Sequence, residues 1–176
     1  MRRRTAGVLG SVTTIDPAAD RLRIISDTGQ NLRHDVNTPA GPTTVDGTLS
    51  YPPAPPPATG VNAAAYTNND LDMNTQTTLY DVDTMMDQIA IQSPANSGQL
   101  AATGKTGVDA TADAGFDIYS VIDDETTDGL ISYATLQVGG RYRLYEVTLF
   151  SGDVDLVGSF PRGVQVSDLA IVLNQL

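Results

Sequence analysis

The chain has 176 residues, 40% of them hydrophobic, which is enough for one domain with a buried core and too much for a chain disordered throughout. Its 21 acidic residues outnumber 10 lysines and arginines, and the net charge of −11 argues against grooves for nucleic acid or anionic lipid. Cysteine is missing, which excludes disulfides, thiolate metal ligands and a cysteine nucleophile, while 16 glycines and 10 prolines favour short strands over long helices.

Residues 1–10 are expected to form an N-terminal tail. The tail begins with Met1 and three consecutive arginines, the basic start of a signal peptide, but Gly7 and Gly10 interrupt the stretch that follows. We predict no working signal peptide in this chain. No apolar run approaches the ~18 residues of a membrane-spanning helix, so we expect no membrane insertion.

A unit of four short strands separated by turns recurs about every 50 residues, a spacing found among propeller repeats. We expect repeats at about 11–50, 60–107 and 113–160, with one extra strand at 164–174, in a single domain spanning 11–176. Turn residues such as those of Asp27-Thr28-Gly29 separate the strands.

Apolar and polar side chains alternate within these segments with the period of two that a half-buried strand requires, as between Leu144, Tyr145, Glu146 and Val147. The predicted fold is therefore all-β and β-propeller-like, with about three four-stranded antiparallel blades plus one extra strand. Propellers typically close with 4–8 blades. Three alternatives follow: a missing N-terminal portion, a homodimer that closes a six-bladed ring, or an incomplete ring that stays open.

Two connecting segments stand out by composition. Residues 51–59 hold five prolines, which lack the donor that a sheet ladder needs, so we interpret them as an interblade connection. A ligand for an aromatic-grooved domain is the alternative. The acidic run at 123–128 is predicted to be a solvated turn.

Several segments resemble a known bacterial family, domain of unknown function 4394. The resemblance rests on residues 20–33, 64–69, 78–83 and 92–98, and on the pair 107–109 and 115–117, all in order and correctly spaced. It implies a propeller-like fold in an extracellular or cell-surface protein with no established activity, so it supplies no catalytic residue. Members of the family usually carry a further N-terminal unit, which implies that this chain is shortened at its N-terminus.

Catalytic motifs are absent from the sequence. His34 is the only histidine, which excludes a zinc site with several imidazoles, and no Gly-x-Ser-x-Gly motif accompanies it. The spacing before Gly104-Lys105-Thr106 does not fit a phosphate-binding loop. We therefore predict no catalytic residue and no cofactor other than calcium.

Calcium is suggested by Asp70, Asp72 and Asn74, which alternate as hard oxygen ligands do in calcium loops. The match breaks at Thr75, where an EF-hand needs glycine, and a polar hairpin loop is the other interpretation.

Two further carboxylates, Asp117 and Asp168, lie near first strands, which line the axis of a propeller. They are the candidates for an axial site, although aspartate near strand ends is commonly turn chemistry. The leading functional hypothesis is a non-enzymatic structural or interaction module of a secreted or surface protein, with a protein or carbohydrate partner. The alternatives are a propeller that binds calcium or a small ligand, and a hydrolase that uses the axial aspartates.

Overall fold

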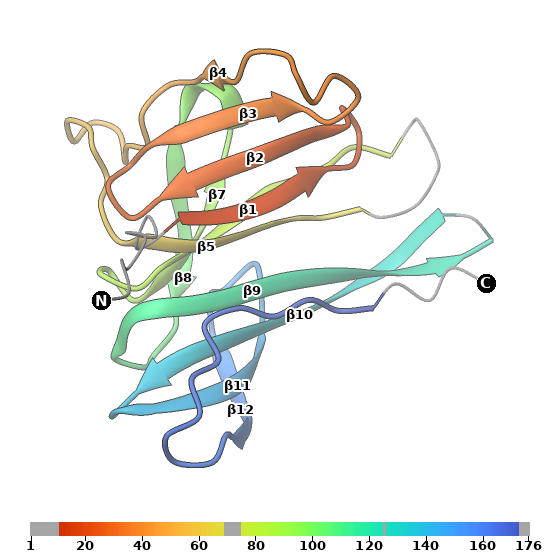
Figure 1. Ribbon diagram of the computed structural model, residues 1–176. Coiled ribbons are helices and arrows are strands. Elements are labelled where there is room, and N and C mark those ends of the chain that lie inside the picture. The colour runs from red at the N-terminus through yellow and green to blue at the C-terminus, as the bar shows by residue number, and fades with distance from the viewer. Residues whose placement is uncertain (1–10, 69–74, 125, 173–176) are drawn as a thin grey trace, which may run out of the picture.

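The computed structural model describes residues 11–68, 75–124 and 126–172, and this part of the chain forms twelve strands in three antiparallel sheets (Figure 1). Blade 1 contains β1 (Ser11–Asp16), β2 (Arg21–Ser26), β3 (Asn31–Asp35) and β4 (Thr44–Val45). Blade 2 contains β5 (Val61–Tyr66), β6 (Leu79–Asp83), β7 (Gln88–Gln92) and β8 (Leu100–Lys105). Blade 3 contains β9 (Ala110–Asp123), β10 (Thr126–Val138), β11 (Arg141–Val147) and β12 (Val154–Ser159).

Each sheet is a meander in which four strands that follow one another in the chain pair in sequence order. The all-β class and the four-stranded antiparallel blades are confirmed, and the ring is incomplete. A single turn of 3-10 helix, Ala95–Ser97, joins β7 to β8. No helix among the described residues is long and apolar enough to cross a membrane.

The first strands of the three blades follow one another, because β1 packs beside β5 and β5 packs beside β9 (Figure 1). This is the order expected of neighbouring propeller blades around an axis. Blade 2 is the middle blade and is covered on both faces, which explains why every residue of β5 and β6 is buried.

Two apolar clusters fill the spaces between the blades. One contains Ile25 of blade 1 with Ala64 and Leu79 of blade 2. The other contains Tyr80 of blade 2 with Phe116 of blade 3. Since successive side chains of a strand project to opposite faces, adjacent positions of β6 serve different interfaces.

Backbones approach closely where blades 2 and 3 meet. A Cβ added to Gly104 of β8 would lie 1.7 Å from the carbonyl oxygen of Ser151, in the β11–β12 loop. Glycine at this position therefore allows two segments almost 50 residues apart to pack together.

In blade 3, the acidic residues 123–128 differ from their predicted structure. The segment 123–128 was predicted as a solvated turn, but β9 continues to Asp123 and β10 begins at Thr126. Val121, Ile122 and Thr127 have high strand propensity, and no glycine or proline interrupts the run before Gly129. The hairpin consequently extends beyond the rest of the sheet (Figure 1).

The outermost strand of blade 1 is shorter than its sequence suggests. Threonine, valine and leucine in residues 43–49 favour a strand, but only Thr44–Val45 pairs with β3. Residues 51–59 then lead to β5, in agreement with the predicted interblade connection.

The predicted extra strand at 164–174 joins no sheet over its described residues, 164–172. This segment lies across β9 (Figure 1), and the backbone N–H of Ile171 donates to Asp117 Oδ2 at 2.7 Å. A Cβ on Gly115 would lie 2.4 Å from the Cα of Asp168. The segment therefore covers the face of the sheet, where backbones cannot form a ladder.

Candidate functional site

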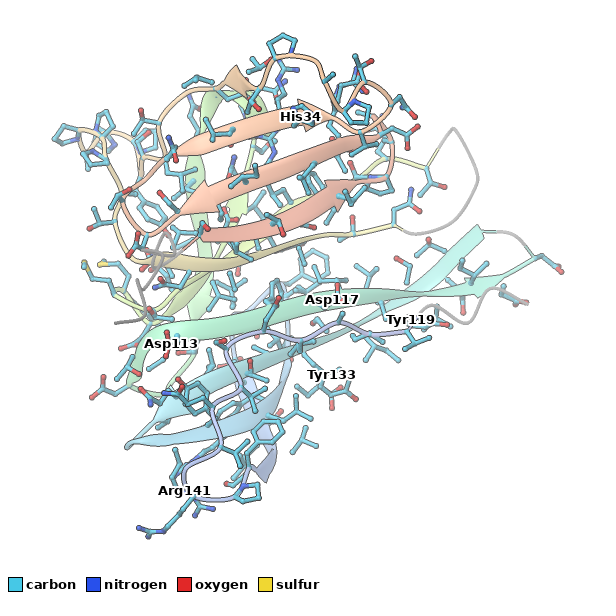
Figure 2. All side chains as sticks on the ribbon, in the orientation of Figure 1. His34, Asp113, Asp117, Tyr119, Tyr133 and Arg141 are labelled. Atoms are coloured by element: carbon cyan, nitrogen blue, oxygen red, sulfur yellow. The ribbon has the colours of Figure 1, made fainter. Side chains whose placement is uncertain are left out.

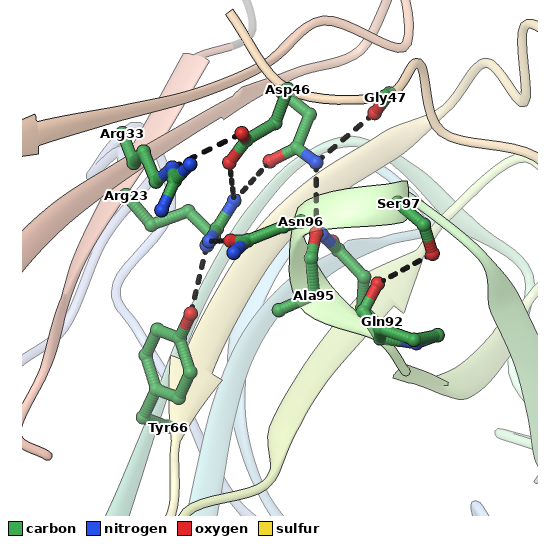
Figure 3. Close-up of polar contacts among 11 residues, drawn as sticks. Arg23, Arg33, Asp46, Gly47, Tyr66, Gln92, Ala95, Asn96 and Ser97 are labelled. Carbon is green, nitrogen blue, oxygen red and sulfur yellow. Dashed lines mark hydrogen bonds and ion pairs between the residues drawn. The ribbon is translucent and has the colours of Figure 1, made fainter. Parts of the chain in front are cut away.

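A cluster of polar side chains, most of them buried, lies between blades 1 and 2 (Figure 3). We call it the interblade cluster, and it consists of Arg23, Asn31, Asp46, Tyr66, Asp81, Gln92 and Asn96. Arg23 is at its centre, with 2% of its surface exposed. It occupies the face of β2 that packs against blade 2, next to Ile25.

The guanidinium group of Arg23 donates four hydrogen bonds. Nε donates to Tyr66 Oη at 2.8 Å, and Nη2 donates to Asn96 Oδ1 at 2.6 Å. Nη1 donates to Asn31 Oδ1 at 2.5 Å and to Asp46 Oδ2 at 3.1 Å. Four of the five N–H groups of the arginine are satisfied, as a buried cation requires.

The amide side chains of the cluster hold the turn that contains the 3-10 helix. Asn31 Nδ2 donates to the carbonyl of Gly47 at 3.1 Å and to that of Ala95 at 2.9 Å. Gln92 Nε2 donates to the same Ala95 carbonyl at 2.6 Å. Asp46 also accepts a hydrogen bond from Arg33 Nε at 3.1 Å, so it pairs with two arginines. Strand β2, the end of blade 1 and the β7–β8 turn are thus fixed together.

Asp81 differs from the other members because its carboxylate has no hydrogen-bond partner. Its surface is 0% exposed, and neither carboxylate oxygen is bonded, nor is Gln92 Oε1, which projects from the same face of the blade. Burial raises the pKa of Asp81 well above its usual range. The nearby charge of Arg23 lowers this pKa, and that of Asp83 raises it further.

Asp83 is also fully buried, but its oxygens are bonded. Oδ1 accepts the backbone N–H groups of Met85 and Met86 at 3.0 and 2.9 Å, and Oδ2 accepts the hydroxyl of Tyr51 at 3.0 Å. Burial, followed by the charge of Asp83, raises the pKa of Tyr51. Asp83 therefore closes the β6–β7 turn and ties the connection from blade 1 to it.

The family of the chain is decided by a match over residues 5–170 to the family described as domain of unknown function (DUF4394). The chain belongs to this family. A search of curated proteins finds none that matches it.

Four of the segments that carry the resemblance to DUF4394 meet in the interblade cluster. Arg23 and Asn31 come from residues 20–33, and Tyr66 comes from residues 64–69. Residues 78–83 supply Asp81, and residues 92–98 supply Gln92 and Asn96, as well as the carbonyl of Ala95. These four segments of the chain thus build one joint between blades.

The two predicted axial aspartates of this DUF4394 chain are close to each other. Asp117 accepts the N–H groups of Ile118 and Ile171, and Asp168 lies above the neighbouring Gly115. Burial raises the pKa of Asp117, the two backbone hydrogen bonds lower it, and the charge of Asp168 raises it. The hydrogen bond from Ile118 is local, whereas the one from Ile171 comes from 54 residues away, so Asp117 anchors the segment 164–172 on β9.

The remaining predicted sites of this DUF4394 chain give no further cluster. Within the described ranges, no group of three histidine, cysteine, aspartate or glutamate side chains is placed to hold a metal ion. The calcium candidates Asp70, Asp72 and Asn74 lie outside the described residues. His34 is on β3, where its Nδ1 lies 3.2 Å from Thr43 Oγ1.

Sequence reasoning missed the interblade cluster as a unit. The same-face placement of Asp81 and Asp83 follows from strand periodicity, whereas the partners of Arg23 are 43 and 73 residues away at Tyr66 and Asn96. The sequence signal that could have indicated the cluster was Arg23 itself, because it shares a face of β2 with the buried Ile25.

Proposed function

We propose that the chain is a non-enzymatic structural or interaction module of a secreted or surface protein. The observation that supports this proposal is the burial of the central side chains of the interblade cluster. Arg23, Asp81 and Gln92 are at most 2% exposed, so a substrate cannot touch them in the folded chain. A catalytic group must reach the reacting atoms, and a buried cluster that joins blades has a structural task instead.

The module would present a rigid stack of blades to its partner. Because the interblade cluster fixes blade 1 and the β7–β8 turn, the loops at the blade ends keep a defined arrangement. Loops held by a rigid scaffold are the usual binding elements of such folds. A protein or a carbohydrate is the partner class that this arrangement suits.

A panel of chromogenic glycosides, esters and phosphate esters tests the non-enzymatic part of the proposal. We expect no turnover above a blank without protein. Turnover that is lost in the double variant Asp117→Asn/Asp168→Asn, and retained in Asp20→Asn/Asp35→Asn on blade 1, would contradict it. That result would support a hydrolase that uses the axial aspartates.

Calcium binding is the second candidate, favoured by the alternation of Asp70, Asp72 and Asn74. A ligand that binds only the folded state raises the melting temperature. Under this alternative, millimolar calcium raises the melting temperature of the wild type and not that of Asp70→Asn/Asp72→Asn. An equal response of both chains to calcium removes this candidate.

A further inference from the structure

Blade 1 has one face that the described residues leave uncovered. Cross-strand partners project to the same side of a sheet, so the registers of blade 1 assign its side chains to two faces. We call the face that points away from blade 2 the back face. It carries Thr13, Ile15, Leu22, Ile24, Leu32, His34 and Val45. Ile15 is 48% exposed and Val45 is 76% exposed.

The corresponding faces of the other two blades are buried. Ala64 and Leu79 of blade 2 face blade 1 and are 2% exposed. Phe116 and Ala134 of blade 3 face blade 2 and are at most 3% exposed. In each case the preceding blade provides the cover. The back face of blade 1 is therefore an apolar surface of the same kind without a preceding blade in the described part of the chain.

The charges at the two ends of the arc limit how two copies of the chain can meet. The chain carries a net charge of −11, yet none of the seven back-face side chains is a carboxylate. We call the face of blade 3 that points away from blade 2 the front face. It carries Asp117 and Tyr133, both labelled in Figure 2, and Glu146, which pairs with Tyr133 across β10 and β11. Two such acidic front faces would repel each other, whereas an uncharged back face can pack against one.

The front face of blade 3 also has apolar groups to cover. The segment 164–172, which lies over β9, leaves Val164 45% exposed and Val172 87% exposed. Each copy of the chain thus has a back face on blade 1 and a front face on blade 3. A second copy that places its back face on this front face continues the direction in which blades 1, 2 and 3 stack within one chain.

We propose that the back face of blade 1 docks on the front of blade 3 of a second copy, so that two chains close head to tail into a six-bladed ring. The segment 164–172 is enclosed in each of the two seams. Six blades fall within the range in which propellers close. A head-to-tail contact that closes after two copies gives a discrete dimer and leaves no apolar face open.

Size-exclusion chromatography with light scattering tests the ring on the full chain. We expect twice the mass of one chain, unchanged over a tenfold range of concentration. The back-face variant Ile15→Glu/Val45→Glu should have the mass of one chain and should still melt cooperatively. The control Met86→Glu replaces a side chain that is 50% exposed and lies at the β6–β7 turn, and it should remain a dimer.

A front-face variant separates this ring from a dimer formed by two back faces. Tyr133→Glu should also give single chains, and mixing it with the back-face variant should restore a complex of two chains through the one intact seam. A wild type with the mass of one chain overturns the proposal. So do polymers that grow with concentration, or a Tyr133→Glu variant that stays folded and dimeric. The proposed function does not depend on this result, because turnover is measured separately.

Discussion

Arg23 is the residue on which the joint between blades 1 and 2 depends most. Its side chain is 3% exposed and forms an ion pair at 3.1 Å with Asp46, whose side chain is 5% exposed. Desolvating two charges is unfavourable, and their attraction offsets the cost only while both partners and their hydrogen bonds are in place. Removing Arg23 takes away a buried cation and leaves the carboxylate of Asp46 paired with Arg33, whose side chain is 37% exposed.

The variant Arg23→Met should lower the free energy of unfolding by about 3–5 kcal/mol, the usual cost of breaking a buried ion pair from one side. Arg21→Met is the matched control, because Arg21 is on the same strand face and pairs with Asp35 at 3.0 Å. Those two side chains are 36% and 34% exposed. An exposed pair contributes ~0–1 kcal/mol. Urea unfolding measures both variants, and equal losses would show that the buried ion pair has no special role.

Asp81 predicts a dependence of stability on pH. Its pKa is raised in the folded chain above the unfolded value of about 3.9, so the folded state holds the proton more tightly. The resulting stabilisation is complete below the unfolded pKa and is lost as the pH rises through the folded pKa. Asp81→Asn carries no titrating group and should avoid this loss.

We therefore expect Asp81→Asn to be more stable than the wild type at neutral pH, and the difference to shrink toward zero as the pH falls below about 4. Urea unfolding of both chains across this pH range is the measurement. Asp35→Asn, at a half-buried position on β3, controls for the loss of a negative charge. Lower stability of Asp81→Asn at neutral pH would mean that the ionised carboxylate stabilises the cluster through Arg23.

Strand β9 and the segment that crosses it depend on one small residue. Gly115→Ala would place a Cβ 2.4 Å from the Cα of Asp168 and 2.7 Å from Thr135 Oγ1. The nearest contact is backbone, so the whole segment must move away. The hydrogen bond from Ile171 to Asp117 would be lost with it.

Hydrogen exchange should show this displacement directly. Gly115→Ala should increase exchange over residues 165–172 while the β5–β6 pair stays protected. The control Gly129→Ala lies in the same sheet, where an added Cβ has no atom within 4 Å, and should leave the segment unchanged. Equal protection in both variants would contradict the close packing of the segment on β9.

The elements were predictable where local pattern decides them. Alternation in β11 and the turn residues between strands predicted the meanders. Both signals are local, so they can be recognised without knowing which strands are neighbours in space. The length of β9 and β10 was not predictable, because a run of acidic residues resembles a loop until pairing across the hairpin is known. The segment 164–172 has the alternation of a strand, but its position over a sheet face is a tertiary property.

The site was less predictable than the fold for a related reason. Asp117 and Asp168 were singled out by their nearness to first strands, and they are close in space. Arg23 was not predicted as a site residue, because its role depends on hydrogen bonds to Tyr66, Asp46 and Asn96, each far from it in the sequence. Polar contacts between blades leave no fixed spacing in a single sequence.

Blades 1 and 2 pack on each other as neighbouring blades of a propeller do. The chain after β4 returns to the turn before β8, where Ser50 pairs with Gln99 in a parallel bridge. The N–H of Ser50 donates to the carbonyl of Gly98, and its carbonyl accepts the N–H of Leu100, both at 2.8 Å. Paired backbones lie about 4.8 Å apart, a separation that a disulfide can span.

The most direct test introduces cysteines at these two positions, because the chain has no thiol of its own. Under mild oxidation, Ser50→Cys/Gln99→Cys should form a disulfide within one chain, seen as the loss of two protons in the intact mass, and unfolding should become about 2–4 kcal/mol less favourable. Ser50→Cys/Ser151→Cys, with its second cysteine in blade 3, should form none. Failure of the first pair to close within one chain, or equal closure of both pairs, would contradict the packing of blade 1 on blade 2.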